Sequence, residues 1–351
     1  MVQQVLQRFD FTYSSPQATP LSTRHSLSAL PSDESVESSG PYPELVGCLM
    51  YLMTCTRPDL AYSLSILARY VAPGRHRPEH MAAAKRVLRY LCSTSGMGLV
   101  LGGHSPVVLT GHADASWADD QATQRSSQGY TFSLGSGSVS WRATRSSSVL
   151  GSSCEAEIYA GAMAAQELRW LTYLLTDLGE PPRSPPVLYV DNKAMLALCR
   201  EQRLEHITKH IALRYFLTRE LQQRGQLRLV YVVSEANTAD VFTKALAPCD
   251  HQRFCTQLGL PASGQEKTLD GLQVQSQFAH VLKLQTTRPF DGKDFFTWSF
   301  EFELMMEGAQ ILGFFDGTSR RESLQPNPTY AAIAQSEPSG KDTWFLDSCC
   351  G

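Results

Sequence analysis

Residues 107–117 read VVLTGHADASW, residues 128–135 read QGYTFSLG and residues 138–143 read SVSWRA. These three short runs are rich in β-branched and aromatic residues and are separated by Gly and Ser, which predicts three consecutive antiparallel strands. Residues 152–182, SSCEAEIYAGAMAAQELRWLTYLLTDLGEPP, then show the spacing of a long amphipathic helix. One of its first two serines can cap this helix, and Gly179 followed by two prolines ends it.

Downstream of this helix, strand-like and helix-like segments alternate. They are the apolar strand VLYVD at 187–191, the helix NKAMLALCRE at 192–201, a basic helix from Ile207 to Arg224, the strand LRLVYVVS at 227–234 and the helix TADVFTKAL at 238–246. The complete order, β-β-β-α-β-α-α-β-α, predicts an α/β fold with a mixed sheet and helices packed against it.

Upstream, the sequence predicts a mainly helical segment. In LVGCLMYLMTCTRPDLAYSLSILARYV, residues 45–71, apolar residues recur every three to four positions and Pro58 ends the first helix. Residues 76–93, HRPEHMAAAKRVLRYLCS, predict a second helix. Residues 14–43 are rich in Ser, Pro and Thr without a sustained period, so they are predicted to be a linker.

The composition argues against several classes of protein. The 351 residues are 42% hydrophobic and 19% charged with a net charge of −3, which is too apolar for a disordered chain and gives no overall basicity for nucleic-acid binding. The nine cysteines form no C-x-x-C pair, so neither a zinc ribbon nor a disulfide framework is indicated. The N-terminus carries charge where a signal peptide needs an apolar core, and the longest apolar stretch, residues 45–55, is far shorter than the roughly 20 residues that span a bilayer. We therefore expect an intracellular protein, cytoplasmic or nuclear, that does not bind membranes.

Four carboxylates stand where a chain of this order can bring them to one edge of the sheet. Asp114 ends the first predicted strand, Asp191 ends the fourth, Glu157 lies in the first turn of the long helix, and Asp240 opens the last helix. Hard divalent cations such as Mg²⁺ prefer oxygen-only sites of this kind. Two ions held about 4 Å apart can bind the attacking and leaving oxygens of a phosphodiester during an in-line displacement. The four residues are therefore candidate metal ligands and catalytic residues.

Each of these carboxylates also has a structural interpretation. An Asp at a strand end is often a turn former, and Asp240 in Thr-Ala-Asp is typical of a helix start with an acid near the positive dipole end. Glu155 and Glu157 compete for one role because they point about 200° apart on a helix, and Glu157 is preferred because it lies closer to the apolar side. Asp119 and Asp120 are predicted to lie in a solvated turn after the first strand.

The motifs GHADASWADD, SSCEAEIYAGAMAAQELRWL, LYVDNKAMLAL, ITKHIALRYFLTREL and YVVSEANTADVFTKAL resemble, in order and spacing, the ribonuclease H domain at the end of copia-type retrotransposon polyproteins. The resemblance implies a ribonuclease H-like fold that cuts the RNA strand of an RNA–DNA hybrid with two Mg²⁺ ions, which Mn²⁺ can replace. Carried over to this sequence, Asp114 would bridge both metals, Glu157 and Asp191 would complete one coordination shell, and Asp240 would hold the second metal.

The sequence departs from the family pattern at three places. Ser116 stands where the family usually has a second aspartate, and Ala212 replaces the aspartate of the usual K-H-I-D. Many cellular ribonucleases H carry a His on the loop before the final aspartate, whereas residues 234–237 read Ser-Glu-Ala-Asn. His210 lies on the preceding helix, where packing or a phosphate contact is as good an interpretation as a catalytic role. None of these changes removes a predicted metal ligand.

The flanking segments resemble other parts of the same polyproteins. Residues 1–105 are similar to the end of the reverse transcriptase region, and residues 106–247 form the predicted ribonuclease H-like domain. Residues 248–285 are predicted to be a linker, although CDHQRFCTQLGL at 249–260 favours one more helix. Residues 286–351 resemble a gag-like helix and a truncated protease-like end, in which Cys349 replaces the glycine that should follow Asp347 and Ser348. The polymerase motif is absent, so no reverse transcriptase activity is expected, and Asp347 is interpreted as a protease remnant.

Two functions are compatible with these features. The first is an RNA–DNA hybrid endonuclease, and the second is a catalytically inactive fragment of a degenerate retrotransposon that binds nucleic acid or other polyprotein segments. In either case a phosphate-contacting surface, taken as the basic helix extended to Arg228, would bind the nucleic acid through Lys209, His210, Arg214, Arg219, Arg224 and Arg228. The four carboxylates favour the endonuclease, and turnover distinguishes the two functions.

Overall fold

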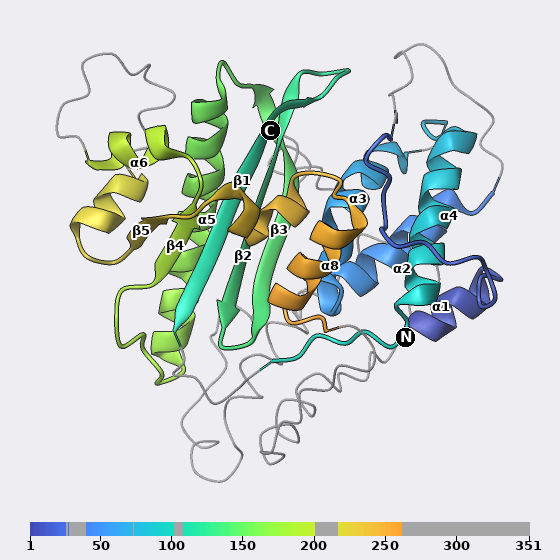
Figure 1. The fold of residues 1–351 in the computed structure, drawn as a ribbon, viewed down its shortest axis with the longest axis horizontal. Helices are drawn as coiled ribbons and strands as arrows, with labels where there is room; N and C mark the ends of the chain where they lie inside the picture. Colours follow the sequence, from blue (N-terminus) through green and yellow to red (C-terminus); the bar gives the residue numbers. More distant parts are fainter. Residues whose placement is uncertain (26, 28–39, 73, 102–107, 201–216, 262–351) are drawn as a thin grey trace, which may run out of the picture. The chain divides into compact units, whose positions relative to one another are not determined.

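The computed structural model describes residues 1–25, 27, 40–72, 74–101, 108–200 and 217–261, which all belong to one compact unit of the chain (Figure 1). Several predictions lie outside these residues, namely the start of the basic helix with Lys209, His210 and Arg214, part of the linker at 14–43, and the tail at 286–351. Within the described residues, no helix combines the length and the apolar character of a membrane span.

The sheet has five strands in the order β3-β2-β1-β4-β5. Strands β1 (Leu109–Asp120), β2 (Arg125–Leu134) and β3 (Gly137–Val149) pair antiparallel in sequence order, as predicted. Strand β4 (Val187–Val190) pairs in parallel with β1, and β5 (Arg228–Tyr231) pairs in parallel with β4. The prediction of a ribonuclease H-like mixed sheet flanked by helices is confirmed.

Helix α5 (Ser153–Asp177) packs on β1 and β2 (Figure 1). Ser152 caps it by accepting a hydrogen bond from the backbone N–H of Glu155 at 3.1 Å, and Gly179 adopts a φ of +81° just after its end. The apolar face of the helix is buried together with strand residues of the sheet: Ile158, Leu168, Leu171 and Leu175 with Ala113 and Tyr130. The helix therefore has the start, the end and the buried face that its sequence predicts.

Three predicted elements differ from the structure. Asp114 lies in the middle of β1 rather than at its end, because the strand continues through an irregularity to Asp120. Arg228 opens β5 instead of belonging to the basic helix, because residues 217–223 are helical and Gly225, with a φ of +68°, follows them. The last predicted helix is a short 3₁₀ helix, η4 (Thr238–Phe242), and Asp240 lies at its centre.

The remaining elements complete the sheet edge and the C-terminal part of the described chain. Helix α6 (Lys193–Arg200) follows β4, and the short η3 (Ser234–Ala236) follows β5. Within the segment predicted to be a linker, Pro248–Gln257 forms helix α8 because its apolar residues Phe254 and Cys255 are buried against neighbouring elements. The other domain boundaries stay predictions.

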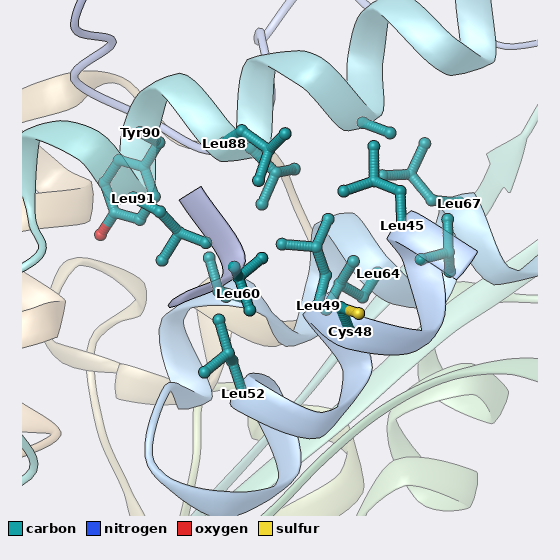
Figure 2. Close-up of a cluster of buried hydrophobic side chains, with 14 of the residues drawn as sticks. Leu45, Cys48, Leu49, Leu52, Leu60, Leu64, Leu67, Leu88, Tyr90 and Leu91 are labelled. Atoms are coloured by element: carbon teal, nitrogen blue, oxygen red, sulfur yellow. The ribbon is translucent and has the colours of Figure 1, made fainter. Parts of the chain in front are cut away.

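The helical block comprises α1 (Val2–Arg8), α2 (Tyr42–Cys55), η1 (Pro58–Leu60), α3 (Ala61–Leu67), η2 (Ala68–Tyr70) and α4 (Pro78–Ser93). Pro58 stands in the first turn after α2, where its missing N–H separates α2 from α3, as predicted. Figure 2 shows the leucines that fill the space between these helices, among them Leu49, Leu60 and Leu88. Burial of these side chains from water holds the block together.

The sheet contacts the helical block, and two residues at the end of β1 that were predicted to be solvated have protein partners. The indole Nε1 of Trp141 donates to the backbone oxygen of Met53 at 3.2 Å. Asp120 at the end of β1 forms ion pairs with Arg69 of η2 at 3.1 Å and with Arg145 of β3 at 2.5 Å. Asp119 accepts hydrogen bonds from the backbone N–H and the hydroxyl of Ser127. The prediction for Asp119 and Asp120 was therefore wrong, because β1 continues and cationic partners lie beside its end.

A buried ion pair stabilises the helical block next to α8. The Arg57 guanidinium donates to both carboxylate oxygens of Asp59, at 2.9 and 2.7 Å, and both side chains are almost fully buried. Tyr90 donates to Asp59 at 2.6 Å, and the remaining Arg57 donors reach Thr94. Burial works against ionisation of Asp59, but the Arg57 charge and hydrogen bonds outweigh it and lower the Asp59 pKa.

Removing one member of this pair should destabilise the protein strongly. We expect Arg57→Leu to lower the free energy of unfolding by about 3–5 kcal/mol, because it leaves the buried Asp59 carboxylate unpaired. Arg253→Leu is the control, since Arg253 pairs with Asp250 on the surface and such pairs contribute about 0–1 kcal/mol. Urea unfolding of both variants measures the difference, and similar losses would contradict the importance of burial.

Candidate active site

Three of the four predicted carboxylates meet in the structure. One ligand oxygen from each of Asp114, Glu157 and Asp191 lies within 4.8 Å of the others. Strands β1 and β4 are parallel neighbours with His112 opposite Tyr189, so Asp114 and Asp191, two residues further along each chain, lie side by side. Asp114 and Glu157 are buried, with exposed fractions of 2% and 8%, whereas Asp191 is half-buried. Together they form the carboxylate cluster.

Asp240 adjoins this cluster through η4. A glycine at position 129, opposite Asp114 on β2, permits the close approach of η4, because a Cβ there would lie 2.4 Å from the Cβ of Phe242. Asn237 caps η4 by accepting from the N–H of Ala239 at 3.3 Å, and its amide donates to the oxygen of Ala113 at 3.0 Å. These contacts tie Asp240 to the strand that carries Asp114.

Lys244 links Asp240 to Asp114. Its Nζ lies 3.0 Å from Oδ1 of Asp240 and 3.7 Å from Oδ2 of Asp114. The Thr243 hydroxyl donates to the same oxygen of Asp114, and the Ser234 hydroxyl donates to Oδ2 of Asp191 at 2.5 Å. Polar side chains of the segment 234–244 therefore hold two of the three clustered carboxylates.

These supporting residues, Ser234, Asn237, Thr243 and Lys244, were not predicted from the sequence. Asn237 had a usable signal, because an Asn just before a predicted helix start is a common cap. Thr243 and Lys244 lie on the same predicted helix as Asp240, but the periodic pattern gave no indication that they face Asp114. Ser234 follows the last strand and had no signal at all.

The structure separates the two candidate glutamates of α5. Glu155 is half-buried, and its Oε2 accepts from the backbone N–H of Gly151 at 2.7 Å, so it supports the start of the helix. Glu157 points to Asp114 and Asp191. Ser116, which stands in place of the family's second aspartate, pairs with Ser127 within the sheet and is outside the cluster.

Crowding makes ionisation of these carboxylates unfavourable. Burial, followed by the charges of Asp114 and Asp191, raises the pKa of Glu157 from 4.5 to about 9. Burial and then the Asp114 charge raise the pKa of Asp240 from 3.8 to about 7, and burial also raises the pKa of Asp114. A divalent cation would remove this repulsion, and the donors are all carboxylate oxygens, so the cluster fits a hard divalent metal ion.

The raised pKa values predict that the stability of the metal-free protein depends on pH. The folded protein holds protons on Glu157 and Asp240 that the unfolded chain has already released, so the free energy of unfolding should fall as pH rises from about 5 towards 9. We expect Glu157→Gln to flatten this fall in EDTA because glutamine does not titrate. Urea unfolding at several pH values measures the slope, and a slope equal to that of wild type would contradict a protonated Glu157.

The predicted nucleic-acid-binding residues are only partly described. Arg224 is exposed and pairs with Glu220 at 2.6 Å, and Arg228 is exposed at the start of β5. Arg219 is half-buried on the helical residues 217–223. None of these three belongs to the carboxylate cluster.

Several known proteins similar to this chain come from transposons. The chain is 35% identical over 263 residues to the retrovirus-related Pol polyprotein from transposon TNT 1-94 of Nicotiana tabacum. The matched region covers 73% of this chain and 19% of that protein. It is 37% identical over 258 residues to the corresponding polyprotein from transposon RE2 of Arabidopsis thaliana, covering 73% of this chain and 17% of that protein. It is also 45% identical over 132 residues to the secreted RxLR effector protein 161 of Plasmopara viticola, covering 38% of this chain and 92% of that protein. No family model matches the chain.

Solved structures with some similarity include the N-terminal RNase H domain of Rv2228c from Mycobacterium tuberculosis and LC11-RNase H1 in complex with an RNA/DNA hybrid. The first is 13% identical with a TM-score of 0.31, covering 39% of this chain and 91% of that one. The second is 10% identical with a TM-score of 0.30, covering 38% of this chain and 93% of that one. At these scores the fold assignment rests on the strand order of the sheet. The sequence relatives therefore fit a fragment of a copia-type retrovirus-related Pol polyprotein, and the chain spans less than a fifth of the length of the TNT 1-94 and RE2 polyproteins.

Proposed function

We propose that this chain hydrolyses the RNA strand of RNA–DNA hybrids with two divalent metal ions, Mg²⁺ or Mn²⁺ in its place, as part of a copia-type polyprotein. The observation that carries the proposal is the meeting of Asp114, Glu157 and Asp191, which come from β1, α5 and the end of β4. Carboxylates from three separate elements, buried in part and with raised pKa values, are typical of a site that binds a cation and acts on phosphate.

The residues divide between the two proposed ions. Asp114, Glu157 and Asp191 would hold one, and Asp114 with Asp240 would hold the other. When bound, the ions would stabilise charge on the attacking and leaving oxygens of the phosphodiester. Asp114 is the shared ligand in this proposal, and the Thr243 hydroxyl holds its carboxylate in place.

The remaining residues of the site act by positioning. Ser234 fixes a carboxylate oxygen of Asp191, and Asn237 fixes η4, and with it Asp240, against β1. Such contacts orient ligands before substrate arrives, so less rearrangement is required during the reaction.

Arginines outside the cluster are proposed to bind the phosphates of the hybrid. We expect the double variant Arg224→Gln/Arg228→Gln to weaken hybrid binding for all sequences and to reduce the slope of log affinity against log salt by up to about two, because each phosphate contact contributes roughly one unit. Turnover at saturating hybrid should change little, since binding common to ground and transition states is lost.

A salt titration by fluorescence anisotropy measures this effect. The control is Lys85→Gln/Arg253→Gln, which removes two cations from α4 and α8 outside the predicted binding set. An unchanged slope combined with a collapse of turnover would contradict a binding role for Arg224 and Arg228.

Substrate preference tests the proposed function. The full chain with Mg²⁺ should cut the RNA strand of an RNA–DNA hybrid and leave double-stranded RNA, single-stranded RNA and double-stranded DNA intact. Binding of the hybrid by folded protein without cleavage would support the alternative of an inactive nucleic-acid-binding fragment.

A further inference from the structure

Lys244 is the feature of the carboxylate site that the proposed function does not use. We propose that Lys244 is a built-in counter-cation of this site: its ammonium group holds Asp114 and Asp240 together while no metal is bound, and metal binding competes with it. The inference rests on the proposed function because it takes these carboxylates as metal ligands. The inference assigns a positioning role to Lys244. It also explains how the neighbouring carboxylates can pack together in the folded protein while no metal is bound.

The first support is the balance of charge. Four carboxylates, Asp114, Glu157, Asp191 and Asp240, lie in or beside the cluster. Among the ion pairs of the described residues, only those of Lys244 reach any of the four. Buried like charges repel strongly in a medium of low dielectric constant, so a single cation between two of them has a large effect.

The second support is the way the backbone places Lys244. The N–H of Lys244 donates to the backbone oxygen of Asp240 at 3.1 Å, and the N–H of Thr243 donates to the same oxygen at 3.2 Å. This turn brings the Lys244 side chain over the Asp240 carboxylate, four residues earlier, while the Thr243 hydroxyl reaches Asp114. Thr243 and Lys244, which are neighbours in this turn, therefore hold the carboxylates of Asp114 and Asp240.

The third support is the difference in exposure. The Lys244 side chain is 40% exposed, whereas the side chains of Asp114 and Asp240 are 2% and 11% exposed. A lysine side chain is ordinarily a cation at neutral pH, and the Nζ of Lys244 lies within ion-pair distance of both carboxylates. A flexible, partly solvated lysine can leave the site when a divalent ion arrives, and the buried carboxylates stay.

Metal affinity and metal-free stability of the full chain test this role without nucleic acid. In EDTA, Lys244→Met should lower Tm by at least about 2–4 °C, which corresponds to about 1 kcal/mol for a unit of this size. Titration calorimetry with Mn²⁺ should show about tenfold tighter binding by Lys244→Met than by wild type, because the ion no longer competes with the ammonium group. The Tm gain on adding Mn²⁺ should therefore be larger for the variant.

Three further variants make the test specific. Lys85→Met removes an exposed lysine of α4 and should change neither quantity. Lys244→Arg keeps the charge and should retain most of the metal-free stability. If Lys244→Met does not fold, Lys244→Met/Asp240→Asn should restore folding, since it removes one partner of each sign.

The outcomes separate this inference from the proposed function. Equal Mn²⁺ affinity for Lys244→Met and wild type, within twofold, would overturn the counter-cation role and favour a direct contact of Lys244 with a phosphate. An unchanged Tm in EDTA would overturn the holding role. If the wild-type protein binds no Mn²⁺, both the competition between Lys244 and the metal and the proposed function are contradicted. The Tm of Lys244→Met in EDTA would still test whether Lys244 holds Asp114 and Asp240 together.

Discussion

Asp114→Asn should reduce hydrolysis of an RNA–DNA hybrid by more than about 10²-fold, the loss that follows removal of a single preorganised electrostatic contact. Asp114 is the carboxylate shared by both proposed ions, and it is almost fully buried between Thr243 and the cluster. Asparagine has the same shape and can still accept the Thr243 hydrogen bond, so the fold should survive. Loss of one repelling charge should leave Tm in EDTA unchanged or higher.

Single-turnover cleavage at saturating Mg²⁺ measures this effect. Asp250→Asn is the matched control, because Asp250 lies on α8 in a surface ion pair with Arg253. Activity of Asp114→Asn within a few-fold of wild type would show that the carboxylate cluster is not the reaction centre.

Glu157→Gln should impair turnover far more than Glu155→Gln. The two residues belong to the same turn of α5 and carry the same charge, but Glu157 faces Asp114 and Asp191 whereas Glu155 binds the backbone of Gly151. We expect a loss of at least about 10²-fold for Glu157→Gln. Glu155→Gln should stay within a few-fold of wild type, because the amide can still accept the bond from Gly151.

Cleavage kinetics and Mn²⁺ titrations, run in parallel on Glu157→Gln and Glu155→Gln, measure the difference between the two variants. The Glu157 variant should bind Mn²⁺ more weakly, and the Glu155 variant should bind it like wild type. Equal losses of activity, or a larger loss for Glu155→Gln, would contradict the assignment of Glu157 as a ligand.

The regular part of the fold could be predicted because local signals agreed with each other. The three β-rich runs and the capped helix α5 had patterns with clear start and stop residues, and β4 was a short, wholly apolar run. The order of elements then predicted a mixed sheet, whereas the parallel pairing of β4 with β1, which places Asp114 beside Asp191, is a finding of the structure.

The polar contacts of the site could not be predicted because they depend on long-range packing. The approach of Thr243 and Lys244 to Asp114 joins residues about 130 positions apart, and it depends on the absence of a side chain at Gly129. Likewise, Asp120 looked like part of a turn because its partner Arg69 lies in the helical block, which no local pattern connects to β1. Local sequence determines which carboxylates are available, and tertiary packing determines which groups surround them.

Hydrolysis of the RNA strand of a hybrid by this carboxylate site, with divalent metal ions, can be measured directly. The most direct measurement is cleavage of a hybrid labelled on both strands by the full chain in Mg²⁺, in EDTA, and after excess Mg²⁺ is restored. The RNA strand should be cut in Mg²⁺, remain intact in EDTA, and be cut again after restoration, while the DNA strand stays intact throughout. RNA cleavage that persists in EDTA, or no cleavage by folded protein that binds both Mg²⁺ and the hybrid, would contradict this function.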